Sequence, residues 1–310
     1  VDTTRSSGEW SPGCRMTLPE KIERAGQLEK RGVDVIEAGF AIASPMDHKS
    51  VQAISAAVTN CTVASLARCA KGDIDAAWDA VKEANHPRIH VFLATSDIHM
   101  EYKLKMTREQ VIDRIREMVA YAKSYCDDIE FSAEDASRSD WSFLAQCYST
   151  AVAAGATTLN VPDTVGYSTP QEMYDLITYL RQNIEGVEHV DISVHCHNDL
   201  GMAVANSPDC VRPGATPGAC TVHGLGERAG QGRRCGLRGR QRGAACGGEG
   251  GRGLRGGAAR SAGGRVLGLS QGLPAALGQP RRLAAVGPEQ RPAPAGGPPA
   301  GQAHAGRVGD

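Results

Sequence analysis

The segment at residues 195–199, with the sequence HCHND, has the residue types and spacing of a metal site. It follows the apolar, β-branched residues 190–194, which indicate a buried strand that ends in polar side chains. Because side chains alternate between the faces of a strand, His195 and His197 point the same way, about 7 Å apart. Two imidazoles at that spacing can bind one divalent metal ion. An isolated pair of this kind is also consistent with two ordinary polar residues, so the surrounding sequence has to decide.

A second group of candidate residues follows from the same alternation. In residues 128–135 (DIEFSAED), Glu130, Ser132 and Glu134 fall on one face of an expected strand with an acidic end. His90 lies inside another expected strand, at residues 88–95. A solvated acidic rim for the two glutamates and a hydrogen-bonded core position for His90 remain open as alternatives.

The elements that must position these residues alternate between strand and helix with a period of about 30 residues along residues 1–230. Capping boxes predict helices that begin after Thr17, Thr107 and Thr169. Pro208 falls within the helix expected after residue 202, so we expect that helix to be shortened. The expected strands, after a first one reduced to its C-terminal end at the start of the chain, are residues 33–40, 61–68, 88–95, 128–135, 157–164, 190–194 and 219–227.

This eightfold pattern over about 230 residues predicts an α/β fold, a (β/α)8 TIM barrel that is incomplete at its C-terminal end. Polar residues gather where the strands end, which places the site on the C-terminal face of the barrel. A doubly wound open sheet is the alternative, although no G-x-G-x-x-G phosphate loop supports it.

Composition divides the chain into an expected barrel domain at residues 1–230 and a different kind of sequence at residues 231–310. The net charge is −1 overall, but the second segment carries about +10, because about 13 Arg face about 3 acidic residues. Its Gly-, Ala-, Arg- and Pro-rich composition predicts a disordered tail. It lacks the aromatic residues of an RNA-binding tail. We favour an out-of-frame translation as its origin, because the break falls within a motif.

Features that would indicate other protein classes are absent from the sequence. The chain opens without a signal peptide, and no apolar run is long enough to span a bilayer, so we expect a cytoplasmic protein. Neither charge nor hydropathy points to a nucleic-acid or membrane partner. The 10 cysteines form no C-x-x-C pair, which favours reduced thiols over a disulfide framework.

Several ordered motifs resemble one known family. Residues 2–13 and 32–40 are similar to the opening, and residues 195–201 and 224–230 to the two later signatures, of the 2-isopropylmalate synthase and homocitrate synthase group. Residues 88–106 resemble the 2-isopropylmalate synthases in particular. The group consists of metal-dependent TIM-barrel acyltransferases, so the resemblance implies the same fold that the periodicity predicts.

The resemblance implies an enzyme that joins acetyl-CoA to the 2-oxo acid 2-oxoisovalerate in a Claisen condensation on the way to leucine. Homocitrate and citramalate synthases remain alternatives, since the 2-oxo acid rests on resemblance alone. A divalent metal (Mg, Mn or Zn) would act as a Lewis acid on the ketone. The resemblance further implies small-molecule substrates as partners and a homodimer.

Carried over by position, the metal ligands are His195 and His197. The residues that contact the 2-oxo acid are His90, Ser132 and Thr164, and Glu134 and Glu130 are the expected catalytic carboxylates.

The sequence departs from the family pattern at three functional positions. The family opening D-T-T-L-R-D-G-E-Q reads D-T-T-R-S-S-G-E-W here, so Ser6 replaces an Arg that stabilises the oxyanion and Ser7 replaces a metal-binding Asp. Gln231 stands where the family has a metal-binding Asn. We therefore expect weak metal binding and little activity. A non-enzyme alternative is a catalytically dead, truncated or frameshifted barrel.

Overall fold

The computed structural model describes residues 1–4, 6, 9, 14, 16–216 and 218–233. The chain divides into two compact units, Val1–Arg252 and Gly253–Asp310, and the second unit lies wholly outside the described residues. The disorder expected for residues 231–310 concerns residues that, apart from 231–233, are not described.

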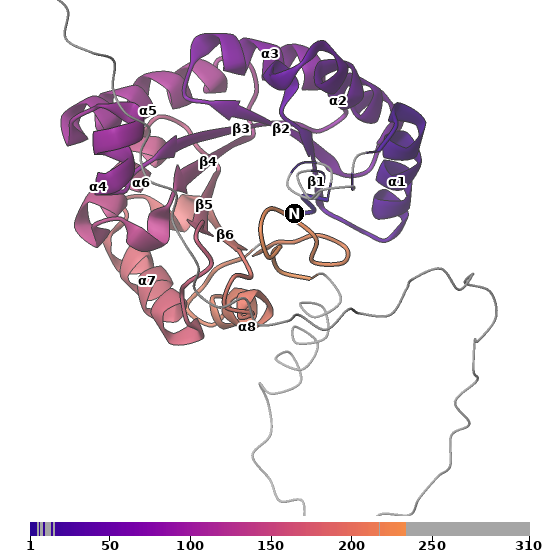
Figure 1. The fold of residues 1–310 in the computed structure, drawn as a ribbon. Helices are drawn as coiled ribbons and strands as arrows, with labels where there is room; N and C mark the ends of the chain where they lie inside the picture. The colour runs from indigo at the N-terminus through magenta and orange to yellow at the C-terminus, as the bar shows by residue number, and fades with distance from the viewer. Residues whose placement is uncertain (5, 7–8, 10–13, 15, 217, 234–310) are drawn as a thin grey trace, which may run out of the picture. The chain divides into compact units, whose positions relative to one another are not determined.

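Seven parallel strands form one sheet in the order of the sequence, from β1 to β7. Helices surround the strands on the outside (Figure 1). The strands are β1 Val35–Gly39, β2 Thr62–Arg68, β3 Pro87–Ala94, β4 Ile129–Glu134, β5 Thr158–Asp163, β6 Asp191–Cys196 and β7 Gly218–Ala219. The α-helices are α1 Leu18–Lys30, α2 Pro45–Ala57, α3 Lys71–Val81, α4 Asp97–His99, α5 Arg108–Lys123, α6 Trp141–Ala153, α7 Pro170–Asn183 and α8 Ala203–Asp209. Shorter helical turns are Ala41–Ala43, Met100–Leu104, Ala136–Arg138 and Val187–His189.

The first residues of the chain act as the eighth strand and close the barrel. Asp2 forms parallel bridges to Ile36 on one side and to Cys220 on the other. The backbone N–H of Asp2 donates to the Val35 carbonyl at 2.8 Å, and that of Thr3 donates to the Cys220 carbonyl at 2.9 Å. The (β/α)8 prediction is therefore confirmed, and the open doubly wound sheet is wrong.

Local sequence explains where three of the helices begin and why a fourth is short. At the start of α7, the Thr169 hydroxyl accepts from the backbone N–H of Glu172, whose carboxylate accepts from the backbone N–H of Thr169 at 2.8 Å. The same reciprocal capping box opens α1 and α5, as predicted. Helix α8 is only 7 residues long and contains Pro208, which agrees with the expected shortening.

The predicted last strand at residues 219–227 is mostly wrong. Strand β7 ends at Ala219, and the chain then turns back on itself. Gly224 and Gly230 have positive φ angles of 79° and 90°. A Cβ atom on Gly230 would lie 2.1 Å from the Gly224 carbonyl oxygen, so this close approach requires glycine. Residues 220–227 therefore form a turn stabilised by this glycine contact, although their sequence pattern is that of a strand.

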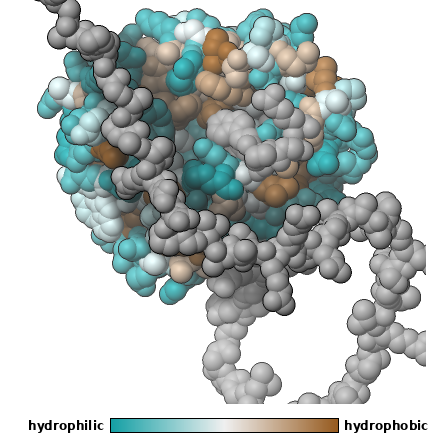
Figure 2. All heavy atoms as spheres, viewed as in Figure 1, coloured by the Kyte–Doolittle hydropathy of each residue, from teal (hydrophilic) through white to brown (hydrophobic). Residues whose placement is uncertain are grey.

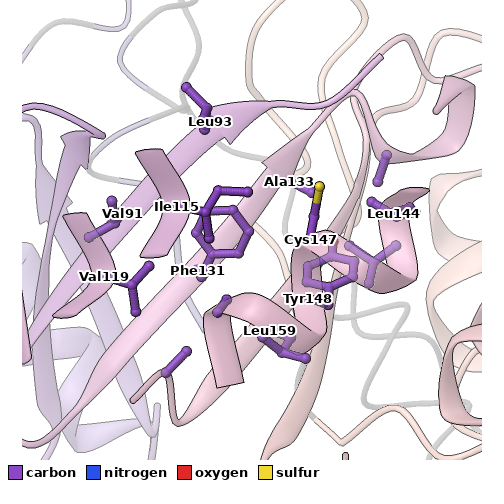
Figure 3. Packing of buried hydrophobic residues seen from close by; sticks show 14 of the residues in the cluster. Val91, Leu93, Ile115, Val119, Phe131, Ala133, Leu144, Cys147, Tyr148 and Leu159 are labelled. Carbon is purple, nitrogen blue, oxygen red and sulfur yellow. The ribbon is translucent and has the colours of Figure 1, made fainter. Parts of the chain in front are cut away.

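The outward faces of the strands pack against the helices to form the main core. Phe131 of β4 meets Tyr148 of α6 edge to face, with ring centroids 6.1 Å apart, and both side chains are fully buried (Figure 3). The Tyr148 hydroxyl donates to the Asn160 carbonyl of β5 at 2.7 Å, which satisfies the one polar atom of that side chain. This rigid outer layer holds the inward-facing residues of β4 and β5 in place.

The surface of the described residues is mainly hydrophilic in the view of Figure 2, with hydrophobic residues in separate spots. Among the described residues, no helix has the length and apolar character needed to cross a membrane.

Candidate active site

Polar side chains from neighbouring strands meet inside the barrel. Strand register pairs His90 of β3 with Glu130 of β4, and Ser132 of β4 with Asn160 of β5. In a parallel sheet, paired residues point to the same face, so these side chains share the barrel interior. All four are buried. The alternation expected from the sequence places Glu130 and Ser132 on this face, and strand register brings His90 to them.

A continuous chain of hydrogen bonds links these strands to β1. His90 Nδ1 lies 2.7 Å from Glu37 Oε2, and His90 Nε2 lies 2.6 Å from Ser132 Oγ. Asn160 Nδ2 donates to Ser132 Oγ at 2.7 Å. At the other end, the Ser6 hydroxyl donates to Glu37 Oε1. The chain from Ser6 to Asn160 fixes the rotamer of every side chain in it.

Glu37 was missing from the residues predicted for the site. It is the single charged residue in the buried strand VIEAG, which is the signal that could have identified it, since an ionised carboxylate is rarely buried without a partner. Burial raises the pKa of Glu37, but the hydrogen bond and charge of His90 outweigh burial and lower it overall. Glu37 is thus a buried carboxylate that stays ionised.

His90 shows the complementary shift. Burial lowers the pKa of His90, but the charges of Glu130 and Glu37, with the hydrogen bond to Glu37, outweigh burial and raise it overall. Glu130 itself is held by Arg88, whose Nη1 lies 3.0 Å from Glu130 Oε2. The Glu130 carboxylate is 3.9 Å from His90 Nε2, so it acts on His90 by charge rather than by a hydrogen bond.

The two histidines predicted as metal ligands lie side by side at the end of β6. Their ring centroids are 5.0 Å apart. Burial and the neighbouring His197 lower the pKa of His195 to about 3, and burial with the charge of Arg228 lowers the pKa of His197. Both imidazoles are therefore neutral near pH 7, the form that binds metal ions.

Three buried polar atoms at and near the end of β6 have the donor chemistry that a divalent metal would need. His195 Nε2, His197 Nδ1 and Gln231 Oε1 are buried and have no hydrogen-bond partner among the described residues. Gln231 forms a bridge to His197, and its Nε2 donates to Thr3 Oγ1. Two imidazole nitrogens and one amide oxygen are suitable donors for such a metal. The described residues contain no group of three or more His, Cys, Asp or Glu side chains arranged to hold a metal ion. Ser7, at the position of the family's metal-binding Asp, is not among the described residues.

Two of the remaining predicted residues lie at the rim, near the strand ends. Glu134, at the end of β4, binds Lys103 with both carboxylate oxygens, at 2.7 and 2.8 Å. Thr164 follows β5, and its hydroxyl accepts from the backbone N–H of Asp135 at 2.9 Å. Neither side chain has a hydrogen bond to the His90 and Ser132 pair among the described residues.

Arg228, in the last family signature, binds the loop at residues 224–230 to two other segments at the rim of the barrel. Arg228 donates to both carboxylate oxygens of Asp199, at 3.0 and 3.1 Å, and to the Thr164 carbonyl. Its φ angle of 56° is left-handed, an uncommon conformation for a residue other than glycine. These contacts hold the segment that carries Gln231 against the segment that carries His197.

Comparison with known proteins identifies the family of this barrel. Residues 1–233 match the HMGL-like family. The chain belongs to the HMGL-like family. Among curated relatives, the HMGL-like chain is 58% identical over 229 residues to a 2-isopropylmalate synthase of Pyrococcus furiosus, covering 74% of this chain and 46% of the relative. A 2-isopropylmalate synthase of Ruminiclostridium cellulolyticum is 56% identical over 229 residues, with 74% and 45% of the two chains covered.

These relatives confirm the resemblance inferred from the motifs, and the chain spans about half the length of the curated relatives it matches. Solved structures of HMGL-like barrels agree in fold. The hydroxymethylglutaryl-CoA lyase of Pseudomonas aeruginosa superimposes with a TM-score of 0.66 at 19% identity, over 77% of this chain and 83% of the lyase. At that identity the likeness concerns the fold alone.

Proposed function

We propose that this chain carries the catalytic barrel of a 2-isopropylmalate synthase, which condenses acetyl-CoA with 2-oxoisovalerate in leucine biosynthesis. The observation that carries this proposal is the identity of 58% to a protein of that name over nearly the whole described barrel. The neutral His195 and His197 pair at the C-terminal end of β6 supports it, because the condensation needs a Lewis acid at the barrel mouth.

The proposed site residues would either bind the metal and the 2-oxo acid or transfer a proton. A divalent metal held by His195, His197 and Gln231 would polarise the ketone of the 2-oxo acid. His90 and Ser132 would bind the oxygens of the 2-oxo acid by exchanging the hydrogen bond that now joins them. Thr164, which follows β5 at the rim, is the third proposed contact of the 2-oxo acid. Glu134 is the proposed base for the acetyl methyl group, and Lys103, which contacts both of its carboxylate oxygens, weakens its basicity until the two side chains separate.

Several finer features belong to the same proposal. The metal is Mg, Mn or Zn, the partners are small-molecule substrates and a second copy of the chain, and the site of action is the cytoplasm. The barrel domain extends over residues 1–230. Glu130, paired with Arg88, has a catalytic role through the charge it places near His90.

Release of free CoA tests the reaction and its substrate. The protein is incubated with Mn²⁺, acetyl-CoA and one of three 2-oxo acids (2-oxoisovalerate, pyruvate or 2-oxoglutarate), and CoA is followed with a thiol reagent. We expect turnover to be slow and highest with 2-oxoisovalerate. A preference for pyruvate or 2-oxoglutarate would contradict the substrate and favour a citramalate or homocitrate synthase instead.

Metal binding has its own test. We expect His195→Ala to weaken Mn²⁺ or Zn²⁺ binding at least ~10-fold in calorimetry, because it removes one of two imidazole ligands. His189→Ala is the matched control, since His189 is an exposed histidine whose side chain is 78% accessible and pairs with Glu188. Equal metal affinity in the two variants would show that the metal binds elsewhere.

The inactive barrel remains the second candidate, and one observation favours it. Ser6, at the position of the family's oxyanion-stabilising Arg, binds Glu37 with a neutral hydroxyl. No guanidinium is then available at this position. This candidate predicts no CoA release with any 2-oxo acid, even when metal is bound.

A further inference from the structure

The hydrogen-bond chain inside the barrel contains a hydroxyl, an imidazole and a carboxylate in series. Ser132 Oγ lies 2.6 Å from His90 Nε2, and His90 Nδ1 lies 2.7 Å from Glu37 Oε2. These distances match those between the nucleophile, the base and the orienting carboxylate of serine hydrolases. The three residues come from β4, β3 and β1, so rigid strands position them.

The positions of the hydrogens on Glu37, His90 and Ser132 would allow His90 to accept the proton of Ser132. An ionised carboxylate accepts hydrogen bonds but cannot donate them, so the Glu37 carboxylate fixes the hydrogen of His90 on Nδ1. In neutral His90, the lone pair of Nε2 therefore faces Ser132 and can accept its proton. The Ser6 hydroxyl and the buried position of Glu37 keep that carboxylate in place.

Asn160 directs the lone pairs of the Ser132 oxygen. A hydroxyl oxygen has one hydrogen and two lone pairs. When His90 is neutral with its hydrogen on Nδ1, the hydrogen of Ser132 points to His90 Nε2. One lone pair of Ser132 Oγ accepts from Asn160 Nδ2 at 2.7 Å. No other described residue donates to Ser132 Oγ, so the second lone pair is available for attack on a carbonyl carbon.

We propose that Ser132, His90 and Glu37 form a nucleophile, base and positioning carboxylate that transfer the acyl group of an activated ester or thioester to Ser132. This activity goes beyond the condensation proposed above and needs neither the metal nor a 2-oxo acid. It uses the same end of the barrel, so a bound 2-oxo acid would compete with it.

The reaction is balanced without any further reactant except water. Ser132 Oγ attacks the acyl carbon while its proton moves to His90 Nε2. The tetrahedral adduct expels the alcohol or thiol, which takes that proton. Water then attacks the Ser132 ester and gives a proton to His90 Nε2. The bond from the acyl carbon to Ser132 Oγ breaks, Ser132 Oγ takes that proton back, and the carboxylic acid is released. Glu37 touches neither reactant and acts only through His90.

An alkyl fluorophosphonate tests the nucleophile directly, because a serine activated by a histidine displaces its fluoride. The full chain is treated with a chelator, incubated with the probe and analysed by intact mass and peptide mapping. We expect one adduct per chain, on Ser132, and a burst of p-nitrophenol from p-nitrophenyl acetate. We expect Ser132→Ala to lose both and His90→Asn to slow labelling at least ~100-fold.

Ser193→Ala is the matched control, since Ser193 is a fully buried serine of the neighbouring β6 whose Oγ has no hydrogen-bond partner in the described chain. We expect it to label at the wild-type rate. The positioning role of Glu37 has a separate readout, the pH dependence of labelling. Labelling should rise with pH as His90 loses its proton, and Glu37→Gln should move that rise to lower pH and slow labelling at least ~10-fold.

Labelling absent from Ser132, or equally fast in His90→Asn and wild type, would overturn the proposal. A pH profile of labelling that is the same in Glu37→Gln and wild type would show that Glu37 does not act on His90. Circular dichroism of each variant shows whether the barrel is folded. Because the assay contains no metal and no 2-oxo acid, its outcome is independent of whether CoA is released in the condensation assay.

Discussion

Replacing Ser6 with Arg and Ser7 with Asp is expected to raise the rate of CoA release at least ~100-fold with acetyl-CoA and 2-oxoisovalerate. Position 6 lies against Glu37, whose carboxylate accepts the Ser6 hydroxyl, so a guanidinium there would bring a fixed cation to the His90 and Ser132 pair. By the family pattern, an aspartate at position 7 would add an anionic metal ligand, and the described residues form no cluster of three His, Cys, Asp or Glu that supplies one. Steady-state kinetics with Mn²⁺ measures the gain.

Two partial variants show which charge matters. Ser6→Arg with Ser7→Asn adds the cation but replaces the carboxylate with a neutral amide of the same shape, so metal affinity should stay weak. Ser6→Ala removes the hydroxyl on Glu37 without adding a cation, and the rate should not rise. If the Arg and Asp variant binds metal tightly and still releases no CoA, the barrel lacks something other than these two groups, and the condensation proposal fails.

Glu37→Gln is expected to lower the free energy of unfolding by about 3 kcal/mol near pH 6, because it leaves the buried His90 without its charged partner. The raised pKa of His90 means that its contribution is complete below about pH 6.5 and is lost as the pH rises through the folded value. The lowered pKa of Glu37 means that its contribution is complete above about pH 4.5 and is lost as the pH falls through the folded value. The loss should therefore be largest between about pH 4.5 and 6.5 and smaller at pH 9.

Urea unfolding at pH 5, 6, 7 and 9 measures this profile. Glu188→Gln is the matched control, because Glu188 pairs with His189 at 3.2 Å on the surface, with both side chains exposed. An exposed pair contributes little, so we expect less than about 1 kcal/mol at any pH. A loss in Glu37→Gln that is equal at pH 6 and pH 9 would mean that His90 is neutral in the folded protein.

Both predictions involve the Glu37 carboxylate and its two neighbours, Ser6 and His90. Where a family member has an Arg at position 6, the Glu37 carboxylate would have two cationic neighbours, whereas here it has a hydroxyl and His90. With Ser6 at this position, a neutral hydroxyl donates to one Glu37 oxygen, and His90, whose pKa is raised by Glu130 and Glu37, contacts the other.

The barrel and much of its interior could be predicted from the sequence, because both follow from local periodicity. The capping threonines Thr17, Thr107 and Thr169 each depend on residues three positions away, and all three begin helices as expected. Alternation along β4 likewise predicted that Glu130 and Ser132 share a face, and strand register adds His90 of β3 to it. Capping boxes use hydrogen bonds between neighbouring residues, and side chains of a strand alternate between its faces whatever lies next to it. Distant contacts therefore have little effect on where these helices begin or which residues share a face.

Contacts between residues far apart in sequence were decided by the tertiary structure alone. Asp2 closes the barrel by pairing with residues 36 and 220, which no local pattern contains. The turn after Ala219 depends on the close approach of Gly224 and Gly230 rather than on strand alternation. The same holds for Glu37, whose spacing along the chain gives no sign of His90, 53 residues away. The sequence by itself determined the fold and the identity of most polar residues, whereas closure of the barrel decided which of them touch.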